Sequence, residues 1–425
     1  MLERKEYVKI HIKHIPADVI ATYNLSEFIV DSHVLFEVIR CMYGHPVAGL
    51  LSNRDLVTHL AQHGYIQHKD IPCLFEHQTN GIQFTLIVDD FGIKYDTDAA
   101  LDHLISILQH KWKLTTDRTG AKYIGMRIAW NYEADIPYFE LDMPNIIPAA
   151  IKRFCPNGPP KGRPSPSIYT PFTPGKPDLN VKVDSSPLVS PEEKKFAEQV
   201  CGVYLYYSRI IDVTMYEPTT AICAQLSAPT KNTMKAIDRL IAYSVQFPNH
   251  KVRYMACDMH LVIASDASYL TLPRGGSKAG GHHYCTNKND VDKINGHIQV
   301  LSVRIPTVCS AVSEAEYAAA FLNAQHGSFE RAVLDALHYS QGITMILCDN
   351  TCAIGIANDT LTLKRSKAID MRYHWLRDRV RLKNFHLVHR PGKQLSADFF
   401  TKALPVHIHQ AFRPQFVTNS PTTLC

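Results

Sequence analysis

The sequence predicts a multidomain protein that combines α/β and α+β regions, and three features support this fold class. The chain has 425 residues, of which 45% are hydrophobic and 20% charged, and this length fits about two or three domains of roughly 100–200 residues each. Twelve of the 25 prolines fall between Pro144 and Pro191, which indicates a break between folded regions. From Leu261 onward, strand-like segments alternate with helical ones, as in a sheet covered by helices.

The region before this break, residues 1–143, is expected to mix strands and helices. Alternating apolar and polar residues over 7–13 and 83–88 predict two strands, and apolar residues at helical spacing over 99–110 predict a helix. Residues 144–190 are expected to form a proline-rich linker, because their prolines and glycines cannot sustain a helix or a central strand.

A helical connector is expected over residues 191–255. Its first helix begins after Ser190, which suits an N-cap, and Glu193 stands at the capping-box position. A second helix is predicted over 232–246.

Residues 256–405 are expected to form a mixed sheet flanked by helices. The pattern predicts a helix that opens at Ser313, a strand over 343–347 and a long helix over 368–382. Residues 406–425 show no clear periodicity and are assigned to a tail.

Cysteine usage and hydropathy exclude several classes of protein. The eleven cysteines are odd in number and form no CxxC pair, which favours free thiols in a reducing compartment over a disulfide framework. The ligand-type residues around Gly280 and Cys348 lack the spacing of a zinc finger, so packing is the favoured interpretation. No uncharged apolar run approaches the roughly 18 residues of a membrane span, and the start of the chain lacks the apolar segment of a secretory signal.

Acidic residues stand at the ends of elements predicted within residues 256–405. Asp266 follows the apolar run LVIAS, Asp349 follows ITMILC, and Asp398 lies in LSADFFTK. A lone acid at the end of a strand is more often a cap or a surface residue, so the prediction depends on their joint occurrence. Carboxylates that converge from different elements are what two divalent ions need in phosphodiester cleavage.

A fourth acid comes from the helix predicted to open at Ser313. Glu314 and Glu316 are two apart, so their side chains point about 200° apart and cannot both face the sheet. Glu314 shares a face with apolar residues, whereas Glu316 lies three residues after Ser313 and fits the capping box. We therefore predict Glu314 as the metal ligand and Glu316 as the capping residue.

Positive charge is concentrated in one stretch. Residues 364–383 hold eight Lys or Arg against two Asp, a local net charge of +6, which leaves −1 for the rest of a chain whose total is +5. Tyr373 and Trp375 are interleaved with these charges. A solvated helix face is the alternative, but this concentration favours a surface that follows a nucleic-acid backbone. The predicted nucleic-acid-binding residues are Lys364, Arg365, Lys367, Arg372, Arg377, Arg379 and Arg381.

Five motifs follow one another in the C-terminal half: SDASY at 265–269, VSEAEY at 312–317, CDN at 348–350, KRSKAIDMRYHWLRDR at 364–379 and SADFFTK at 396–402. In order and spacing they resemble the RNase H domain of copia-type LTR retrotransposons. This resemblance implies an RNase H-like fold that hydrolyses the RNA strand of an RNA–DNA hybrid. It implies a two-metal site for Mg²⁺, with Mn²⁺ as an alternative, held by Asp266, Glu314, Asp349 and Asp398. It also suggests that His389 assists product release; a plain polar loop residue is the alternative.

An Asp89-Asp90 pair follows an apolar strand near the start of the chain. By itself the pair fits a hairpin turn. Together, however, the segments MYGHPVAG at 42–49, FTLIVDDFG at 84–92 and YIGM at 123–126 resemble copia-type reverse transcriptases. The resemblance implies that residues 1–143 are a partial fingers and palm region, in which Asp89 and Asp90 are catalytic metal ligands.

Two departures from the reverse transcriptase pattern predict a defective RNA-directed DNA polymerase. The third palm carboxylate of the family would lie before Met1, and Val47 stands where the family usually has glutamine. We therefore expect a truncated reading frame whose polymerase site lacks one of its acids.

The whole sequence is thus predicted to be the C-terminal part of a retrotransposon Pol polyprotein. It combines a truncated reverse transcriptase, a helical thumb or connection and an RNase H domain. Its expected partners are RNA–DNA hybrids, DNA or RNA templates and other chains of the polyprotein, with no membrane. The expected location is cytoplasmic, in a virus-like particle, and nuclear. The alternative hypothesis is a catalytically silent or co-opted protein that only binds nucleic acid.

Overall fold

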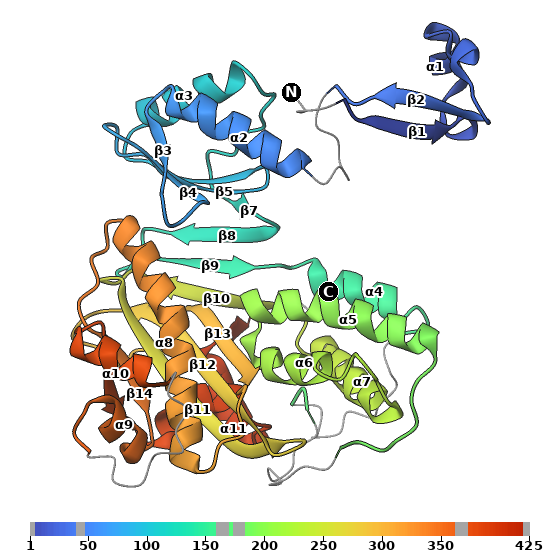
Figure 1. Ribbon diagram of the computed structural model, residues 1–425. Coiled ribbons are helices and arrows are strands. Elements are labelled where there is room, and N and C mark those ends of the chain that lie inside the picture. The colour runs from blue at the N-terminus through green and yellow to red at the C-terminus, as the bar shows by residue number, and fades with distance from the viewer. Residues whose placement is uncertain (1–4, 40–46, 159–169, 173–182, 362–372, 420–425) are drawn as a thin grey trace. The chain divides into compact units, whose positions relative to one another are not determined.

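The structure is a computed structural model that describes residues 5–39, 47–158, 170–172, 183–361 and 373–419 (Figure 1). The chain forms two compact units, Met1–Thr116 and Asp117–Cys425. Both units combine helices with sheets, so the predicted multidomain mixed fold class is confirmed. The units divide upstream of the predicted boundary at residue 143, because strands over 122–142 pair within the second unit.

The first unit contains a four-stranded antiparallel sheet of order β3-β4-β5-β6 and a separate ribbon of β1 and β2. Leu60 of α2 and Leu104 of α3 pack with Phe75 and Phe84 of the sheet to form its core. The predicted strands at 7–13 and 83–88 and the predicted helix at 99–110 are confirmed as β1, β5 and α3. The elements are β1 (Tyr7–His11), η1 (Ile12–His14), α1 (Ala17–Thr22), η2 (Leu25–Phe28), β2 (His33–Glu37), α2 (Ala48–Ala61), β3 (Tyr65–Gln67), β4 (Leu74–His77), β5 (Gln83–Ile87), β6 (Asp90–Lys94) and α3 (Asp98–Gln109).

The second unit begins with a helical region and strands of a five-stranded antiparallel sheet of order β16-β10-β9-β8-β7. These elements are β7 (Lys122–Tyr123), β8 (Met126–Asn131), β9 (Tyr138–Asp142), α4 (Ile146–Phe154), α5 (Pro191–Ile210), η4 (Val213–Met215), α6 (Tyr216–Cys223), α7 (Lys231–Gln246) and β10 (His250–Met255). The predicted capping box is present, since Ser190 accepts from the Glu193 backbone and the Glu193 carboxylate accepts from the Ser190 backbone. The connector is helical as predicted up to α7, but its end forms strand β10.

A five-stranded mixed sheet dominates the rest of this unit, in the order β13-β12-β11-β14-β15. Strands β11, β12 and β13 are antiparallel neighbours, whereas β14 runs parallel to β11 and to β15. The elements are β11 (His260–Leu272), β12 (Gly276–Thr286), β13 (His297–Arg304), α8 (Val312–Ala336), β14 (Thr344–Cys348), α9 (Thr351–Ala357), α10 (His374–Arg381), β15 (Phe385–His389), η6 (Gly392–Gln394), η7 (Ser396–Phe400), α11 (Val406–Phe412), η8 (Arg413–Gln415) and β16 (Thr418–Asn419).

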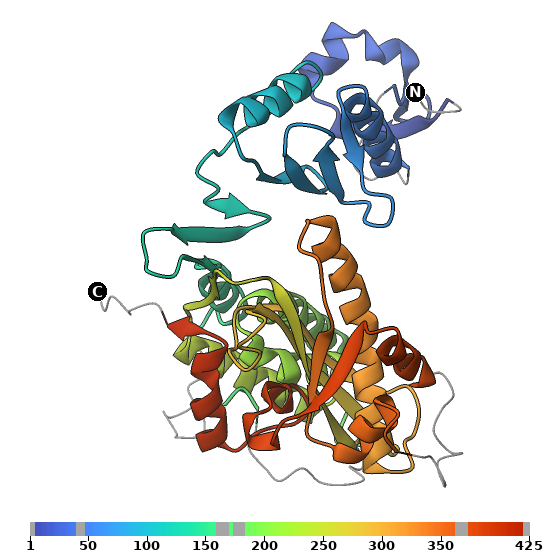
Figure 2. The ribbon, with the colours of Figure 1, turned by 90° about the vertical axis from the view of Figure 1, so that its left-hand side faces the viewer.

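The long helix α8 lies along one face of this sheet (Figure 2). Its alanines, including Ala315, Ala319 and Ala324, belong to the same buried core as Leu261 and Ile263 of β11. Their small side chains allow a close approach of helix and sheet. The predicted mixed sheet flanked by helices is therefore confirmed.

Helix α4 lies inside the predicted linker, which is a departure from the sequence interpretation. Its one proline, Pro148, stands in the first turn, where a missing N–H breaks no helical hydrogen bond. The helix buries Ile147, Ala150 and Phe154 in the core that it shares with α5 and α7. Burial of an apolar face thus decides this segment more than its overall proline content does.

The predicted tail is also folded over its described residues. Strand β16 pairs with β10, and the side chain of Arg413 is buried, donating to the hydroxyl of Tyr243 and contacting His250. His250 in turn lies 2.7 Å from the buried carboxylate of Asp212. Residues 406–419 therefore close the second unit against its helical region.

Within the described residues, no helix has the length and apolar character that a bilayer span requires. The nine cysteines placed there are all free, in agreement with the predicted absence of a disulfide framework.

Candidate metal centre

Two of the predicted acids stand side by side on adjacent parallel strands, Asp266 in the middle of β11 and Asp349 just after the end of β14. The register between β11 and β14 pairs Ala264 with Leu347, and its continuation by two residues places Asp266 opposite Asp349. Neighbouring strands are about 4.8 Å apart, so the two carboxylates belong to one site. Asp266 is buried and Asp349 is partly exposed.

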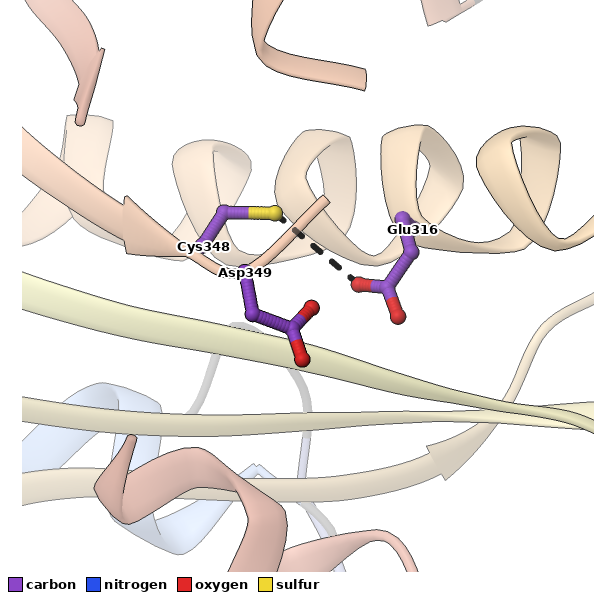
Figure 3. A group of neighbouring side chains, drawn as sticks. All are labelled: Glu316, Cys348 and Asp349. Carbon is purple, nitrogen blue, oxygen red and sulfur yellow. Dashed lines mark hydrogen bonds between the residues drawn. The ribbon is translucent and has the colours of Figure 1, made fainter. Parts of the chain in front are cut away.

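The third carboxylate comes from Glu316, and this corrects the sequence interpretation. Figure 3 shows the side chain of Glu316 pointing from α8 toward Asp349 and Cys348, and one ligand-type atom of each residue lies within 4.8 Å of the others. Glu314 faces elsewhere, because its carboxylate accepts from the backbone N–H of Ser310 at 2.6 Å and from the Ser310 hydroxyl at 2.7 Å. Glu316 rather than Glu314 therefore lies beside Asp349, and the predicted capping box at Ser313 does not form, because the N-cap is Ala311.

The position of the helix start explains this difference. Helix α8 begins at Val312 with Ala311 as its N-cap, whereas the sequence predicted Ser313 as the cap. Ser310, just before the helix, donates a hydrogen bond to the Glu314 carboxylate, and Glu316 is the glutamate that points toward the sheet. A serine four residues before Glu314 was the available signal in the sequence.

The short helix η7 carries Asp398 to the same site. It lies against β12 at Gly280, the residue paired with Asp266, where an added Cβ would stand 2.5 Å from Cγ2 of Thr401 and 2.9 Å from the Ala397 carbonyl. Only a glycine on β12 leaves this space. The hydroxyl of Thr401 donates to Asp266 at 2.6 Å, which ties the segment that bears Asp398 to the carboxylate on β11.

Burial and mutual repulsion make two of these carboxylates hard to ionise. Desolvation, reinforced by the charge of Asp398, raises the pKa of Asp266 to about 7. Desolvation, reinforced by the charges of Asp266 and Asp349, raises the pKa of Glu316 to about 9. Perturbed acids that face one another in this way are typical of functional sites.

The donor set fits a divalent cation. Four carboxylates from β11, α8, the end of β14 and η7 supply the hard oxygen ligands that Mg²⁺ and Mn²⁺ prefer. The crowding that raises the pKa of Asp266 and Glu316 is relieved when a cation sits among them. Cys348 is buried in the core behind the acids, and its thiol contacts Glu316 at 4.0 Å.

His389 lies at the end of β15, exposed, opposite Cys348 in the parallel register of β14 and β15. Gly392, three residues later, comes so close to Asp349 that an added Cβ would stand 2.9 Å from its carboxylate. The loop that carries His389 therefore borders the acid site, and a role in product release stays a prediction.

The basic stretch is only partly described. Lys364, Arg365, Lys367 and Arg372 lie outside the described residues. On α10, Arg377 and Arg381 both pair with Asp359, and Arg379 pairs with Asp378 and stands 5.3 Å from the ring of Trp375. Asp359 lies before residues 364–383, over which the net charge was counted. The count therefore left out the acid that pairs with two of the arginines.

Tyr373 is a core residue, contrary to the predicted surface role. Its ring is buried against Phe321 and its hydroxyl contacts the Thr307 hydroxyl at 2.6 Å. Trp375 is partly buried and stacks edge-on against Phe321. The short helix α10 buries one face against the core, and the aromatic residues at its start lie on that face.

Asp89 and Asp90 lie at the tip of the β5–β6 hairpin in the first unit, and both are exposed. The two-residue loop puts Val88 at φ 59°, a conformation that a β-branched residue rarely adopts. In the described part of the chain, no third residue of ligand type converges with this pair. Tyr123–Met126 forms the β7–β8 turn of the second unit, and residues 42–46 lie outside the described residues.

No protein-family model matches the chain. Among curated proteins, it is 30% identical over 98 residues to the retrovirus-related Pol polyprotein of transposon TNT 1-94 from Nicotiana tabacum. The predicted resemblance to a retrotransposon Pol polyprotein is confirmed. The match covers 23% of this chain and 7% of that polyprotein, so the chain spans only a small part of its relative's length.

Solved structures similar to this chain include RNase H1 enzymes and a viral protease-reverse transcriptase. LC11-RNase H1 in complex with an RNA/DNA hybrid matches 33% of the chain and 93% of its own length, at 14% identity and a TM-score of 0.26. LC11-RNase H1 isolated from compost matches 34% and 93%, at 15% identity and a TM-score of 0.25. The protease-reverse transcriptase of prototype foamy virus matches 89% of the chain and 42% of its own length, at 10% identity and a TM-score of 0.21.

Proposed function

We propose that the second unit of this Pol-related chain is a divalent-metal-dependent nuclease that hydrolyses the RNA strand of RNA–DNA hybrids. The observation that carries the proposal is the convergence of four carboxylates at one mixed sheet: Asp266 on β11, Asp349 just after β14, Glu316 on α8 and Asp398 on η7. The order of the surrounding motifs supports the hybrid as substrate, since it resembles that of copia-type RNase H domains.

Each group of the site has a distinct part in this function. Asp266, Glu316, Asp349 and Asp398 would hold the cations, and Thr401 fixes the orientation of the Asp266 carboxylate. Divalent ions held there supply Lewis acidity and charge stabilisation for phosphodiester hydrolysis. Water attacks the phosphorus and the 3′ oxygen departs, so the products carry 3′-hydroxyl and 5′-phosphate ends. A hybrid duplex would be held through its phosphates and 2′-hydroxyls.

Cleavage of a labelled RNA–DNA hybrid by the purified full chain tests this function. We expect cleavage with Mg²⁺ or Mn²⁺, its loss on chelation, and its loss in Asp349→Asn, which folds with one charge fewer in the site. If the wild-type chain binds the hybrid without cutting it under either metal, the nuclease proposal fails. The protein would then be a nucleic-acid-binding relic.

We further propose that the first unit lacks RNA-directed DNA polymerase activity. This rests on the isolated position of Asp89 and Asp90, which supply half of a two-metal site. Primer extension on an RNA template with the purified chain is expected to give no product. Metal-dependent DNA synthesis that is lost in Asp89→Asn would contradict this proposal.

A further inference from the structure

One cationic side chain lies inside the acid site. Lys402 follows Asp398 by four residues, and its ammonium forms an ion pair with the Asp398 carboxylate. Its side chain is about two-thirds buried, at 32% exposure, and that of Asp398 is at 24%. A lysine this deep beside a carboxylate cluster is unusual, since an ammonium is strongly hydrated and is mostly found in solvent.

The charge of Lys402 acts on more than its direct partner. It stabilises the ionised forms of Asp266 and Glu316, the two acids that burial makes hard to ionise. Burial alone acts to lower the pKa of Lys402, but the carboxylates of Asp266, Asp398 and Asp349 outweigh this and raise it. The ammonium is therefore paired with Asp398 and attracted by the charges of the other carboxylates that would hold a metal ion.

We propose that Lys402 is a built-in counter-ion of the metal-free site, and that a divalent cation binds by displacing its ammonium group. The inference rests on the proposed metal site, although it does not require hybrid cleavage. Two like-signed ions a few ångströms apart repel strongly in a partly buried site, so ammonium and metal compete for Asp398. The four-carbon side chain and its exposed third give the ammonium a way to solvent.

Calorimetric titration of the full chain with Mn²⁺ alone, at fixed pH, tests the proposal. Lys402→Met is expected to bind Mn²⁺ about ten-fold more tightly than wild type, because the competing charge is gone. Lys402→Arg keeps the charge and should keep an affinity near that of wild type. Lys195→Met, which removes the same charge from an exposed lysine on helix α5 of the same unit, is the matched control and should change nothing.

Unchanged Mn²⁺ affinity in Lys402→Met would overturn the proposal, and weaker binding would show instead that Lys402 positions Asp398 for the metal. Thermal unfolding gives a second readout. Without metal, Lys402→Met should unfold at a lower temperature than wild type, and saturating Mn²⁺ should raise its midpoint by more. Lys402→Gln serves the same purpose if Lys402→Met does not fold. A wild type that binds Mn²⁺ but leaves the hybrid intact would refute the nuclease and leave this inference standing.

Discussion

Two glutamates of α8 that are two residues apart have different surroundings. Glu316 faces Asp349, while Glu314 is held by Ser310 outside the helix. Periodicity predicted that one of the pair would face the sheet. The capping rule selected Glu314, but it placed the N-cap at Ser313, whereas the N-cap is Ala311 and the helix begins two residues earlier than that rule indicates.

The pair supplies its own matched test. Glu316→Gln is expected to lower hybrid cleavage by at least about 100-fold, since a metal ligand and a charge are lost together. Glu314→Gln should leave the rate within about three-fold and cost about 1 kcal/mol of stability through the weaker contact to Ser310. The rates are measured with Mg²⁺ at saturating hybrid. A reversed order of the two effects would restore the original assignment of Glu314.

Raised acid pKa values predict that metal binding releases protons. With pKa values of about 7 for Asp266 and about 9 for Glu316 in the metal-free chain, both groups are largely protonated at pH 6. A cation must displace those protons, so its apparent affinity should rise as the pH rises from 6 to 9. Calorimetry with Mn²⁺ in two buffers of different ionisation enthalpy measures the release directly. Identical heats in both buffers would show that the acids are already ionised.

At the scale of elements, the site depends on how closely η7 approaches the sheet. Gly280 permits this approach, so Gly280→Ala must push Thr401 and the Ala397 carbonyl away from β12. We expect a loss of about 1–3 kcal/mol in unfolding free energy and weaker Mn²⁺ binding, because Asp398 moves with η7. Both are measured by urea denaturation and by calorimetry.

The control for this substitution is Gly202→Ala, in helix α5 of the same unit, where an added Cβ meets nothing within 4 Å. It should be neutral or stabilise the protein by up to about 1 kcal/mol, as alanine does inside a helix. Equal effects of the two alanines would mean that η7 is free to shift.

The elements themselves were largely predictable from local pattern, whereas their ends and their partners were not. The Ser190 capping box and the strand after Thr344 have strong local signals, and both are present. Helix α4 was missed because its burial against α5 outweighs the proline content of its surroundings. The pairing of the α10 arginines with Asp359 was missed because Asp359 lies outside the basic stretch in sequence and meets it only in the folded chain.

At the scale of the whole molecule, the buried histidines of the second unit make its stability depend on pH. Burial lowers the pKa of His297 and of His409 to about 4 and that of His282 still further below its ordinary value. The unfolded chain therefore binds more protons than the folded one below about pH 6.5. The stability that these neutral histidines contribute is fully present above that pH. It is lost as the pH falls toward 4, by up to about 3 kcal/mol for each histidine.

Urea denaturation at pH 8, 6 and 5 measures this loss. Asp266 and Glu316 act in the opposite direction, because their raised pKa values favour the folded state at low pH. The histidine contribution is isolated by comparison with His297→Gln, whose stability should fall less steeply with acid than that of wild type. His386→Gln changes an exposed histidine and should keep the wild-type slope. Parallel slopes in all three proteins would contradict the prediction.

The pairing of β16 with β10, and the contact of Arg413 with His250, have a consequence for the order of synthesis and folding. A ribosome that has made residues up to 405 has already produced all four acids and Lys402. The nascent chain then contains every charged group of the carboxylate site, but it lacks residues 406–419, which complete the second unit. Until residues 406–419 emerge, Asp212 and His250 lack their buried cation, and the edge of β10 is open to pairing with other chains.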